Sequence, residues 1–394
     1  MAGLVADAAG NLYGTDSQGG GGVVGECNCG AVFELSPPAA AGGAWTRTVI
    51  HIFTGGEDGS YPVGTLILDS GGNLYGTTRG EEDHTDQASK GIVFEFSPPS
   101  TPGGAWTETI IWNFDPVGGV ARGFAPWGKL EVDALGNLYG TAHLGGNLEG
   151  CPNCGLVFEL VKPRAAGDSW KEKVLYEFGA VSNDGTRPAP NLLLRGGILY
   201  GTTDLGGAFG KGTVFQLTRQ SGFWAETILH SFDGADGIDP HGGLIADPEG
   251  NLYGTTFVSP ICSAGCGTIY ELSPPEVPGG PWQEATLYKF QGPGDGSEPN
   301  AALWRDKTGS LWGTATSGGL ISVDFGRYGG TMFKLNPPST PGESWDFVTA
   351  HEFGLRTGDA VQPYGELILR DGTFYGTSIL GGSLFAGTVF SYTP

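Results

Sequence analysis

The hexapeptide Gly10-Asn11-Leu12-Tyr13-Gly14-Thr15 decides the fold, because close variants of it recur along the whole chain. Its seven copies begin at Gly10, Gly72, Gly136, Gly197, Gly250, Gly309 and Gly372. The aromatic residues of successive copies are 53 to 64 residues apart. Self-similarity at a nearly constant spacing indicates a repeat architecture, in which each copy is one structural unit.

Three further motifs recur with the same period as the hexapeptide. A Gly-x-Val-Phe-type run follows each copy, at Gly30, Gly91, Gly155, Gly212, Gly267, Gly330 and Gly387. A run of alternating apolar residues begins with Trp and occurs six times, at Trp45, Trp106, Trp170, Trp224, Trp282 and Trp345. A Leu-x-x-Asp run or a close variant precedes each hexapeptide. Each run is bounded by Gly, Pro, Asn or Asp, as strands are.

Four strands in each of seven repeats, with no helical periodicity, predict an all-β fold. The arrangement that fits is a seven-bladed β-propeller of four-stranded blades, formed as one domain by residues 1–394. Because the Trp run is absent from the seventh repeat, blade 7 should lack its outermost strand. An unpaired strand edge is a template for another chain.

Composition narrows the range of partners. The 394 residues include 72 Gly and 26 Pro, and the net charge is −22 from 20 basic and 42 acidic residues. Such a surface repels phosphate backbones, so nucleic acid and anionic membranes are not expected partners. No apolar run reaches the length of a membrane span, and the first residues do not resemble a signal peptide. Glycans, metal cations, basic proteins and further copies of the chain remain candidate partners.

The repeated strings also carry a family resemblance. Asp-x-x-Gly-Asn-Leu-Tyr-Gly-Thr-Thr, Gly-Thr-Val-Phe-Glu-Leu-Ser-Pro-Pro and Asp-Gly-x-x-Pro resemble the GloVer tandem-repeat family, over essentially the whole chain. Its repeats occur in secreted or surface-attached bacterial proteins of the choice-of-anchor type. The resemblance implies a propeller and an extracellular or cell-surface location, and it brings no catalytic residues. We recognise no sorting signal or anchor at either end.

Cysteines occur as three local pairs. They are Cys27 with Cys29, Cys151 with Cys154, and Cys262 with Cys266, each just before the third strand of blades 1, 3 and 5. A structural zinc site takes four ligands, which alternate blades would keep apart. We therefore expect three disulfide bridges, with free thiols or metal-bound thiolates as the alternatives. Such bridges persist in oxidising compartments, in agreement with an extracellular location.

Residues that stay the same in every repeat are interpreted as structural. The Asp of the Leu-x-x-Asp run, such as Asp7, should open a turn through backbone hydrogen bonds. Tyr13 and its equivalents should pack between blades with a satisfied hydroxyl. We also expect His51, His230 and His351, which share one position in the fourth strand, to pack rather than to catalyse.

Residues that vary between repeats mark the candidate binding site. If the Leu-x-x-Asp strand is innermost, the Asp-Gly-x-x-Pro connections and the loops after Gly-Thr-Thr share one face, and binding residues tend to lie on such loops. Side chains just after the loop Pro would form an aromatic and polar rim at the channel mouth, able to bind a sugar. The rim residues are Trp127, Lys129, His241, Asn300, Tyr364 and Glu366. The alternative is that they only plug the channel.

A second candidate site is the loop from residue 233 to residue 239. It spaces Asp233, Asp236 and Asp239 in a glycine-rich turn, and carboxylate oxygens suit calcium. The loop lacks the regular alternation and the closing Glu of a calcium-hand loop, so an acidic turn without an ion is the alternative. No cofactor other than calcium is expected.

Motifs for common enzyme classes are absent from the sequence. There is no Gly-x-Ser-x-Gly, His-Glu-x-x-His, phosphate-loop or dinucleotide motif. We therefore expect a secreted, non-catalytic structural or interaction module. One hypothesis for its role is self-association into an extracellular polymer, because non-closing contacts propagate. A monomer with a three-stranded last blade is the alternative. The competing function is a carbohydrate-binding or carbohydrate-cleaving protein with its site on the variable face.

Overall fold

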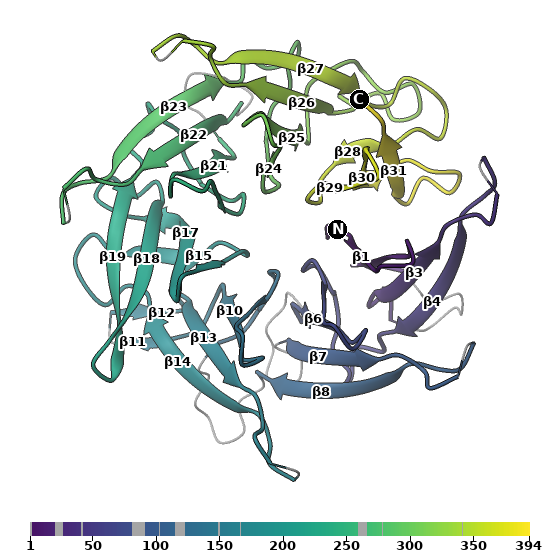
Figure 1. The fold of residues 1–394 in the computed structure, drawn as a ribbon, viewed down its shortest axis with the longest axis horizontal. Helices are drawn as coiled ribbons and strands as arrows, with labels where there is room; N and C mark the ends of the chain where they lie inside the picture. The colour runs from purple at the N-terminus through teal and green to yellow at the C-terminus, as the bar shows by residue number, and fades with distance from the viewer. Residues whose placement is uncertain are drawn as a thin grey trace. The chain divides into compact units, whose positions relative to one another are not determined.

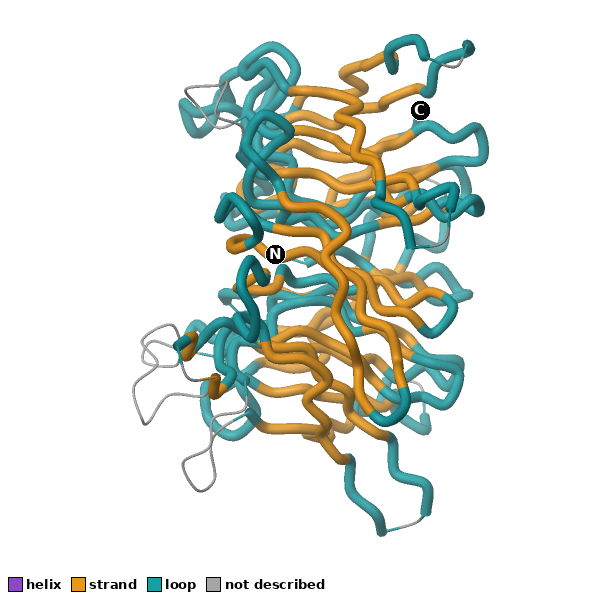
Figure 2. The backbone as a smooth tube through the Cα atoms, turned by 90° about the vertical axis from the view of Figure 1, so that its left-hand side faces the viewer, coloured by secondary structure: helices purple, strands orange, loops and turns teal. Residues whose placement is uncertain are grey.

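The computed structural model describes residues 2–19, 27–40, 42–80, 91–101, 103–114, 123–148, 150–165, 167–258, 266–277, 279–340 and 342–394. Over these residues the chain forms strands, turns and loops without any helix, and strands alternate with loops throughout (Figure 2). It divides into two compact units, Met1–Ala180 and Val181–Pro394. Whether residues 1–394 form a single domain therefore stays a prediction.

The first unit contains blades 1 to 3 (Figure 1). Its strands are β1 (Val5–Ala6), β2 (Leu12–Asp16), β3 (Ala31–Ser36), β4 (Thr46–Ile52), β5 (Ile67–Leu68), β6 (Leu74–Thr78), β7 (Ile92–Ser97), β8 (Thr107–Asn113), β9 (Glu131–Val132), β10 (Leu138–Ala142), β11 (Asn147–Leu148), β12 (Cys151–Pro152), β13 (Leu156–Val161) and β14 (Lys171–Glu177). They form the antiparallel sheets β1-β2-β3-β4, β5-β6-β7-β8 and β9-β10-β13-β14, with β11 and β12 as a separate hairpin.

The second unit contains blades 4 to 7. Its strands are β15 (Gly185–Pro188), β16 (Leu193–Arg195), β17 (Ile198–Gly206), β18 (Thr213–Gln220), β19 (Phe223–Ser231), β20 (Ile245–Ala246), β21 (Leu252–Thr256), β22 (Thr268–Ser273), β23 (Gln283–Lys289), β24 (Trp304–Arg305), β25 (Leu311–Ala315), β26 (Thr331–Asn336), β27 (Asp346–Glu352), β28 (Val361–Pro363), β29 (Ile368–Arg370), β30 (Thr373–Leu380) and β31 (Thr388–Tyr392). In blades 4 and 7 the innermost strand is formed by two pieces that pair with the same second strand. In every blade the described strands pair in antiparallel order from the innermost strand outward, and the fold is the predicted seven-bladed β-propeller.

Each repeat motif has a place in this sheet. The Gly of the second strand lies opposite the aromatic residue of the third, as Gly14 does opposite Phe33. A Cβ at Gly14 would lie 2.8 Å from the Phe33 ring, so only glycine lets the ring lie across the strand. Next to this aromatic residue, a register shift interrupts the pairing with the fourth strand in all six blades that have one.

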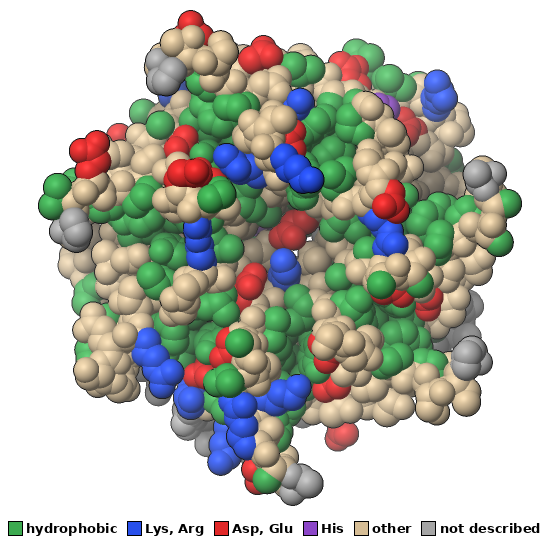
Figure 3. All heavy atoms as spheres, viewed as in Figure 1, with side chains coloured by type: hydrophobic (Ala, Val, Ile, Leu, Met, Phe, Trp, Pro, Cys, Tyr) green, Lys and Arg blue, Asp and Glu red, His purple; other side chains and the backbone are tan. Residues whose placement is uncertain are grey.

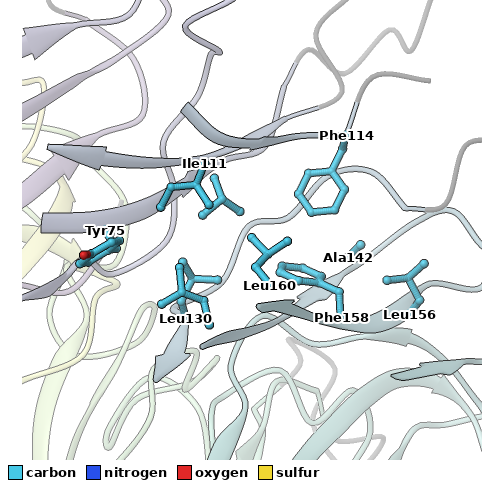
Figure 4. Close-up of a cluster of buried hydrophobic side chains, with 10 residues drawn as sticks. Tyr75, Ile111, Phe114, Leu130, Ala142, Leu156, Phe158 and Leu160 are labelled. Carbon is cyan, nitrogen blue, oxygen red and sulfur yellow. The ribbon is translucent and has the colours of Figure 1, made fainter. Parts of the chain in front are cut away.

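The hydrophobic core lies between neighbouring blades. In the first unit, Tyr75 of blade 2 belongs to one buried cluster with Leu130, Leu156 and Phe158 of blade 3 (Figure 4). Each blade packs against its neighbour through apolar side chains, and removal of this apolar surface from water stabilises both blades.

Turns between the first and second strands are held by the predicted aspartates. The Asp7 carboxylate accepts hydrogen bonds from the N–H groups of Gly10 and Asn11 at 2.8 and 2.9 Å, and from the Tyr13 hydroxyl at 3.1 Å. Burial alone would raise the pKa of Asp7, but these bonds outweigh it and the pKa is lowered. The Asn and Tyr bonds recur at Asp69, Asp133 and Asp247. These aspartates are structural, as predicted.

The last described strand of blade 7 is its third strand, β31 (Thr388–Tyr392). Strand β31 pairs with β30, and among the described residues no strand pairs with its other edge. Its aromatic residue, Phe390, is only half-buried, whereas Phe94, Phe158 and Phe333 at the same position in other blades are fully buried. Among the described residues, blade 7 therefore has no fourth strand outside β31, in agreement with the sequence prediction.

Candidate functional site

Six residues adopt the same left-handed backbone conformation immediately before the loop proline of their blades. Their φ angles lie between 56° and 60°. They differ in chemistry, and they are Tyr61, Ala125, Arg187, Asp239, Glu298 and Gln362. Residues other than glycine adopt this conformation only where their surroundings impose it, and such residues cluster at functional sites.

Contacts around the proline impose this conformation. In blade 2, the Tyr61 N–H donates to the Cys29 carbonyl at 2.7 Å, and the Tyr61 carbonyl accepts from the Arg79 N–H at 3.0 Å. Pro62 packs against Gly30 of blade 1, where a Cβ would lie 2.5 Å from the proline Cδ. We call this arrangement of the proline, the residue before it and the facing glycine the proline junction.

Blade 5 repeats the proline junction with a different side chain. The Asp239 N–H donates to the Lys211 carbonyl at 3.1 Å, and the Asp239 carbonyl accepts from the Phe257 N–H at 2.8 Å. Pro240 packs against Gly212 in the same way as Pro62 against Gly30. Because backbone atoms make these contacts, the junction holds its geometry while its side chains vary.

The second unit contains four of the predicted rim residues. Asn191 donates from its side-chain amide to Glu366 at 3.0 Å, although the two lie 175 residues apart in sequence. The Asn300 amide donates to the Thr316 hydroxyl at 3.3 Å. Tyr364 is half-buried directly after its proline junction. Glu366 and Asn300 thus form polar side-chain contacts within the second unit.

Trp127 and Lys129 lie in the first unit, and both are half-buried. The Trp127 ring lies 4.4 Å from the His143 ring, with the planes tilted by 51°. A hollow of about 310 Å³ in the same unit is lined by Ser17, Gln18, Tyr61, Val63 and Arg79. In this hollow, Tyr61 and Val63, which flank the loop proline, lie beside Arg79, which follows the Gly-Thr-Thr motif.

His241, the fourth rim residue of the second unit, lies in a cluster with two carboxylates. Its Nδ1 is 3.3 Å from Asp204 Oδ1 and 3.9 Å from Asp239 Oδ1. In the part of the chain that the structure describes, these three residues form the one group of His, Cys, Asp or Glu side chains whose ligating atoms all lie within 4.8 Å of one another. Asp239 Oδ1 is buried and has no hydrogen-bond partner in the described part of the chain.

The pKa values of Asp239 and His241 are both shifted in this cluster. Burial, followed by the negative charge of Asp204, raises the pKa of Asp239 to about 7. Burial would lower the pKa of His241, but the hydrogen bond to Asp204 and the charges of both carboxylates outweigh it, so this pKa is raised. Two carboxylates this close repel each other unless a proton or a cation lies between them.

The other two residues of the predicted calcium loop have different partners. Asp236 Oδ2 lies 2.7 Å from His230 Nε2, and Asp236 Oδ1 accepts the Asp233 N–H at 3.0 Å. Blade 1 has the same pairing between His51 and Asp58. Asp236 therefore closes a turn that recurs in the repeat, and the structure groups Asp239 with Asp204 and His241 instead of with Asp233 and Asp236.

The fourth-strand histidines pack against aromatic rings, as predicted. His51, His230 and His351 each lie edge-on to the Phe two residues further along, at 4.8, 4.8 and 4.7 Å between ring centroids.

Two of the predicted cysteine pairs lie at disulfide-bonding distance. The Cα atoms are 5.1 Å apart for Cys27 and Cys29, and 5.6 Å apart for Cys151 and Cys154. In the third pair, Cys266 is fully buried, and Cys262 lies outside the described residues.

Sequence reasoning selected the side chains after the loop proline and missed two other positions that flank them. These are the residue before the proline, such as Tyr61, and the residue after the Gly-Thr-Thr motif, such as Asp204. Both positions vary between blades at a constant distance from a repeat motif, which is the signal that could have identified them.

Comparison with known families agrees with the repeat analysis. The profile of the Gloeobacter/Verrucomicrobia repeat matches residues 1–192, 87–277 and 226–394, and thus the whole chain. The chain belongs to this family. A search of curated proteins finds no match.

Solved structures similar to this member of the repeat family share its fold at low sequence identity. A candidate 6-phosphogluconolactonase from Bacteroides uniformis is 13% identical at a TM-score of 0.51, over 91% of this chain and 84% of the other. PorZ, a bacterial surface component of the type-IX secretion system of Porphyromonas gingivalis, is 14% identical at a TM-score of 0.51, over 97% of this chain and 45% of PorZ. At such identities the likeness shows the fold alone.

Among the described residues, no helix is long and apolar enough to cross a membrane.

Proposed function

We propose that this member of the repeat family is a secreted, non-catalytic interaction module that self-associates through the outer edge of blade 7. The observation that carries the proposal is the half-buried Phe390 on β31. In other blades a fourth strand helps to bury this position, and among the described residues no such strand covers β31. A strand donated by a second copy would bury Phe390 and pair the free edge.

Two apolar loops, one of which leads directly into β31, support the proposal. The loop before β31 exposes Leu384 and Phe385, and the loop between β25 and β26 exposes Leu320, Ile321 and Val323. The Phe385 ring contacts Phe325 of the latter loop at 5.6 Å between centroids. Contiguous exposed apolar side chains mark interaction sites on proteins.

Charge supports a protein partner over a polyanion. The net charge is −22, and acidic, basic and apolar side chains are interspersed on the face drawn in Figure 3. The two cysteine pairs at disulfide distance favour an oxidising, extracellular location. If the edge of blade 7 pairs with a different edge of the next copy, the contact repeats head to tail and forms a polymer, whereas edge-to-edge pairing of two β31 strands closes a dimer.

Completing the blade tests this function. Residues 338–353, which follow Pro337 and include the outer strand of blade 6, would be appended after Pro394, the equivalent proline of blade 7. Light scattering and electron microscopy of non-reduced protein should show concentration-dependent assembly for the natural chain and for a control with a Gly-Ser tail of equal length. The completed blade should remain monomeric. A natural chain that is monomeric at every concentration, or a completed blade that still assembles, would refute the proposal.

A second function is favoured by the Trp127 and His143 pair on the variable loops of the first unit. Aromatic rings beside polar groups bind sugar rings through stacking and hydroxyl hydrogen bonds. Glycan-array binding that is lost in Trp127→Ala would support a carbohydrate-binding protein, and cleavage of the bound glycan would support a hydrolase. No binding to any glycan by the folded protein would reject this second function.

A further inference from the structure

We propose that Asp204, Asp239 and His241 bind one divalent transition-metal ion, with Zn²⁺ as the ion that fits the ligands best. The site lies within the second unit. Asp204 follows the Gly-Thr-Thr motif of blade 4, and the other two residues flank Pro240 in blade 5. It is independent of the edge of blade 7, and thus of the proposed self-association.

The distances are close to those of a metal site. Zinc binds His nitrogen and carboxylate oxygen at about 2.0 to 2.2 Å, which places tetrahedral ligands about 3.4 Å from one another. His241 Nδ1 is 3.3 Å from Asp204 Oδ1 and 3.9 Å from Asp239 Oδ1. Small side-chain rotations would therefore be enough to hold the ion. Three protein ligands leave a fourth position for water or a ligand.

A buried oxygen that accepts no hydrogen bond points to a bound cation. Asp239 Oδ1 has no hydrogen-bond partner among the described residues, although water does not reach it. A buried carboxylate oxygen that accepts no hydrogen bond costs free energy. The proline junction holds Asp239 in a left-handed conformation beside Asp204. Moving the two carboxylates apart would therefore require a change in the backbone of the junction. A cation would pair both of them.

Comparison among the blades shows that the fold does not require this cluster. At the proline junction of blade 6, Glu298 and Asn300 replace Asp239 and His241, and φ of Glu298 is also 60°. Blade 7 has Gln362 and Tyr364 at these positions. The same backbone geometry thus forms with other side chains. The proline junction therefore does not itself require the Asp239 carboxylate or the His241 imidazole.

The ligand types select the metal. Imidazole suits zinc and other transition metals, whereas calcium takes six to eight oxygen ligands. His241 therefore argues for Zn²⁺ over Ca²⁺. The side chains of His241, Asp204 and Asp239 are 16%, 13% and 31% exposed, so an ion can reach the site from solvent.

Calorimetric titration of the tag-free, EDTA-treated full chain with Zn²⁺ alone tests the site. We expect one tight site per chain and a higher unfolding temperature with Zn²⁺. His241→Asn and Asp204→Thr take their new residues from Asn300 and Thr316 of blade 6, and each should weaken binding by at least about 100-fold. Glu298→Gln is the matched control and should bind as the natural chain does, which also corrects for weak binding to surface carboxylates.

Three results would overturn the proposal. The first is a folded natural chain that binds no Zn²⁺. The second is His241→Asn, folded by circular dichroism, that binds Zn²⁺ with unchanged affinity. The third comes from a parallel titration with Ca²⁺: a chain that binds Ca²⁺ in preference to Zn²⁺, and loses this binding in Asp233→Asn but not in His241→Asn, would place the site in the loop of residues 233–239.

Discussion

Replacing Gly30 with alanine tests the proline junction that positions the variable side chains. Gly30 has φ of +98°, and an added Cβ would lie 2.5 Å from Pro62 Cδ and closer still to the Asp16 carbonyl oxygen. Both neighbours belong to the backbone or to a proline ring, so neither can rotate away. The substitution should therefore strain the contact between blades 1 and 2.

The expected loss of stability has two parts. The left-handed conformation costs alanine about 1 to 2 kcal/mol, and forcing a methyl group into a packed contact adds about 1 to 3 kcal/mol. Gly222 is the matched control, because its φ is +101° and nothing lies within 4 Å of its added Cβ. Gly222→Ala should show only the first part.

Urea unfolding followed by tryptophan fluorescence measures both variants. We expect the free energy of unfolding to fall by about 2 to 5 kcal/mol for Gly30→Ala and by about 1 to 2 kcal/mol for Gly222→Ala. If the two variants lose equal stability, Pro62 does not lie against Gly30, and the proline junction is not what holds Tyr61 in place.

Three further predictions concern pH and packing. Burial raises the pKa of Glu108 to about 7 from 4.5, so the natural chain should lose stability as pH rises between these values. Glu108→Gln should match the natural chain at about pH 5 and exceed it by about 1 to 2 kcal/mol at about pH 8, in urea unfolding at both pH values. The exposed Glu249→Gln should show no such difference. Asp69→Ala removes four hydrogen bonds and should cost about 2 to 3 kcal/mol at neutral pH. Because the Asp69 pKa is lowered, this cost should shrink only as pH falls below about 4, and an equal cost in acid would contradict the turn assignment. Phe333→Ala should cost about 3 to 5 kcal/mol in thermal unfolding, and Phe390→Ala about half as much or less in the monomer; equal costs would mean that Phe390 is fully buried.

Local sequence was enough to predict the blades. The hexapeptide, the Gly-x-Val-Phe run and the Trp run each specify one strand by residues that act on their near neighbours. Gly14, for example, is opposite Phe33 through simple antiparallel pairing. The count of Trp runs also predicted the free edge of β31, because each run forms one outer strand.

The candidate site was predicted only in part. His241 was selected because it varies after a loop proline, but its partner Asp204 belongs to the preceding blade, 37 residues away. Asp239 was grouped with Asp233 and Asp236 because they are close in sequence. The left-handed backbone at Asp239 turns its carboxylate toward Asp204 and His241 instead.

The sequence by itself determined the all-β class, the seven repeats, the strand order and the positions at which side chains vary, because these depend on contacts within one repeat. Tertiary structure alone decided which variable side chains meet. Asn191 and Glu366 bond across 175 residues, and the proline junction forms only when a proline of one blade packs against a glycine of the blade before it. Such contacts between distant residues depend on how the sheets pack against one another. Sheet packing is set by long-range geometry, which leaves no periodic signal in the sequence.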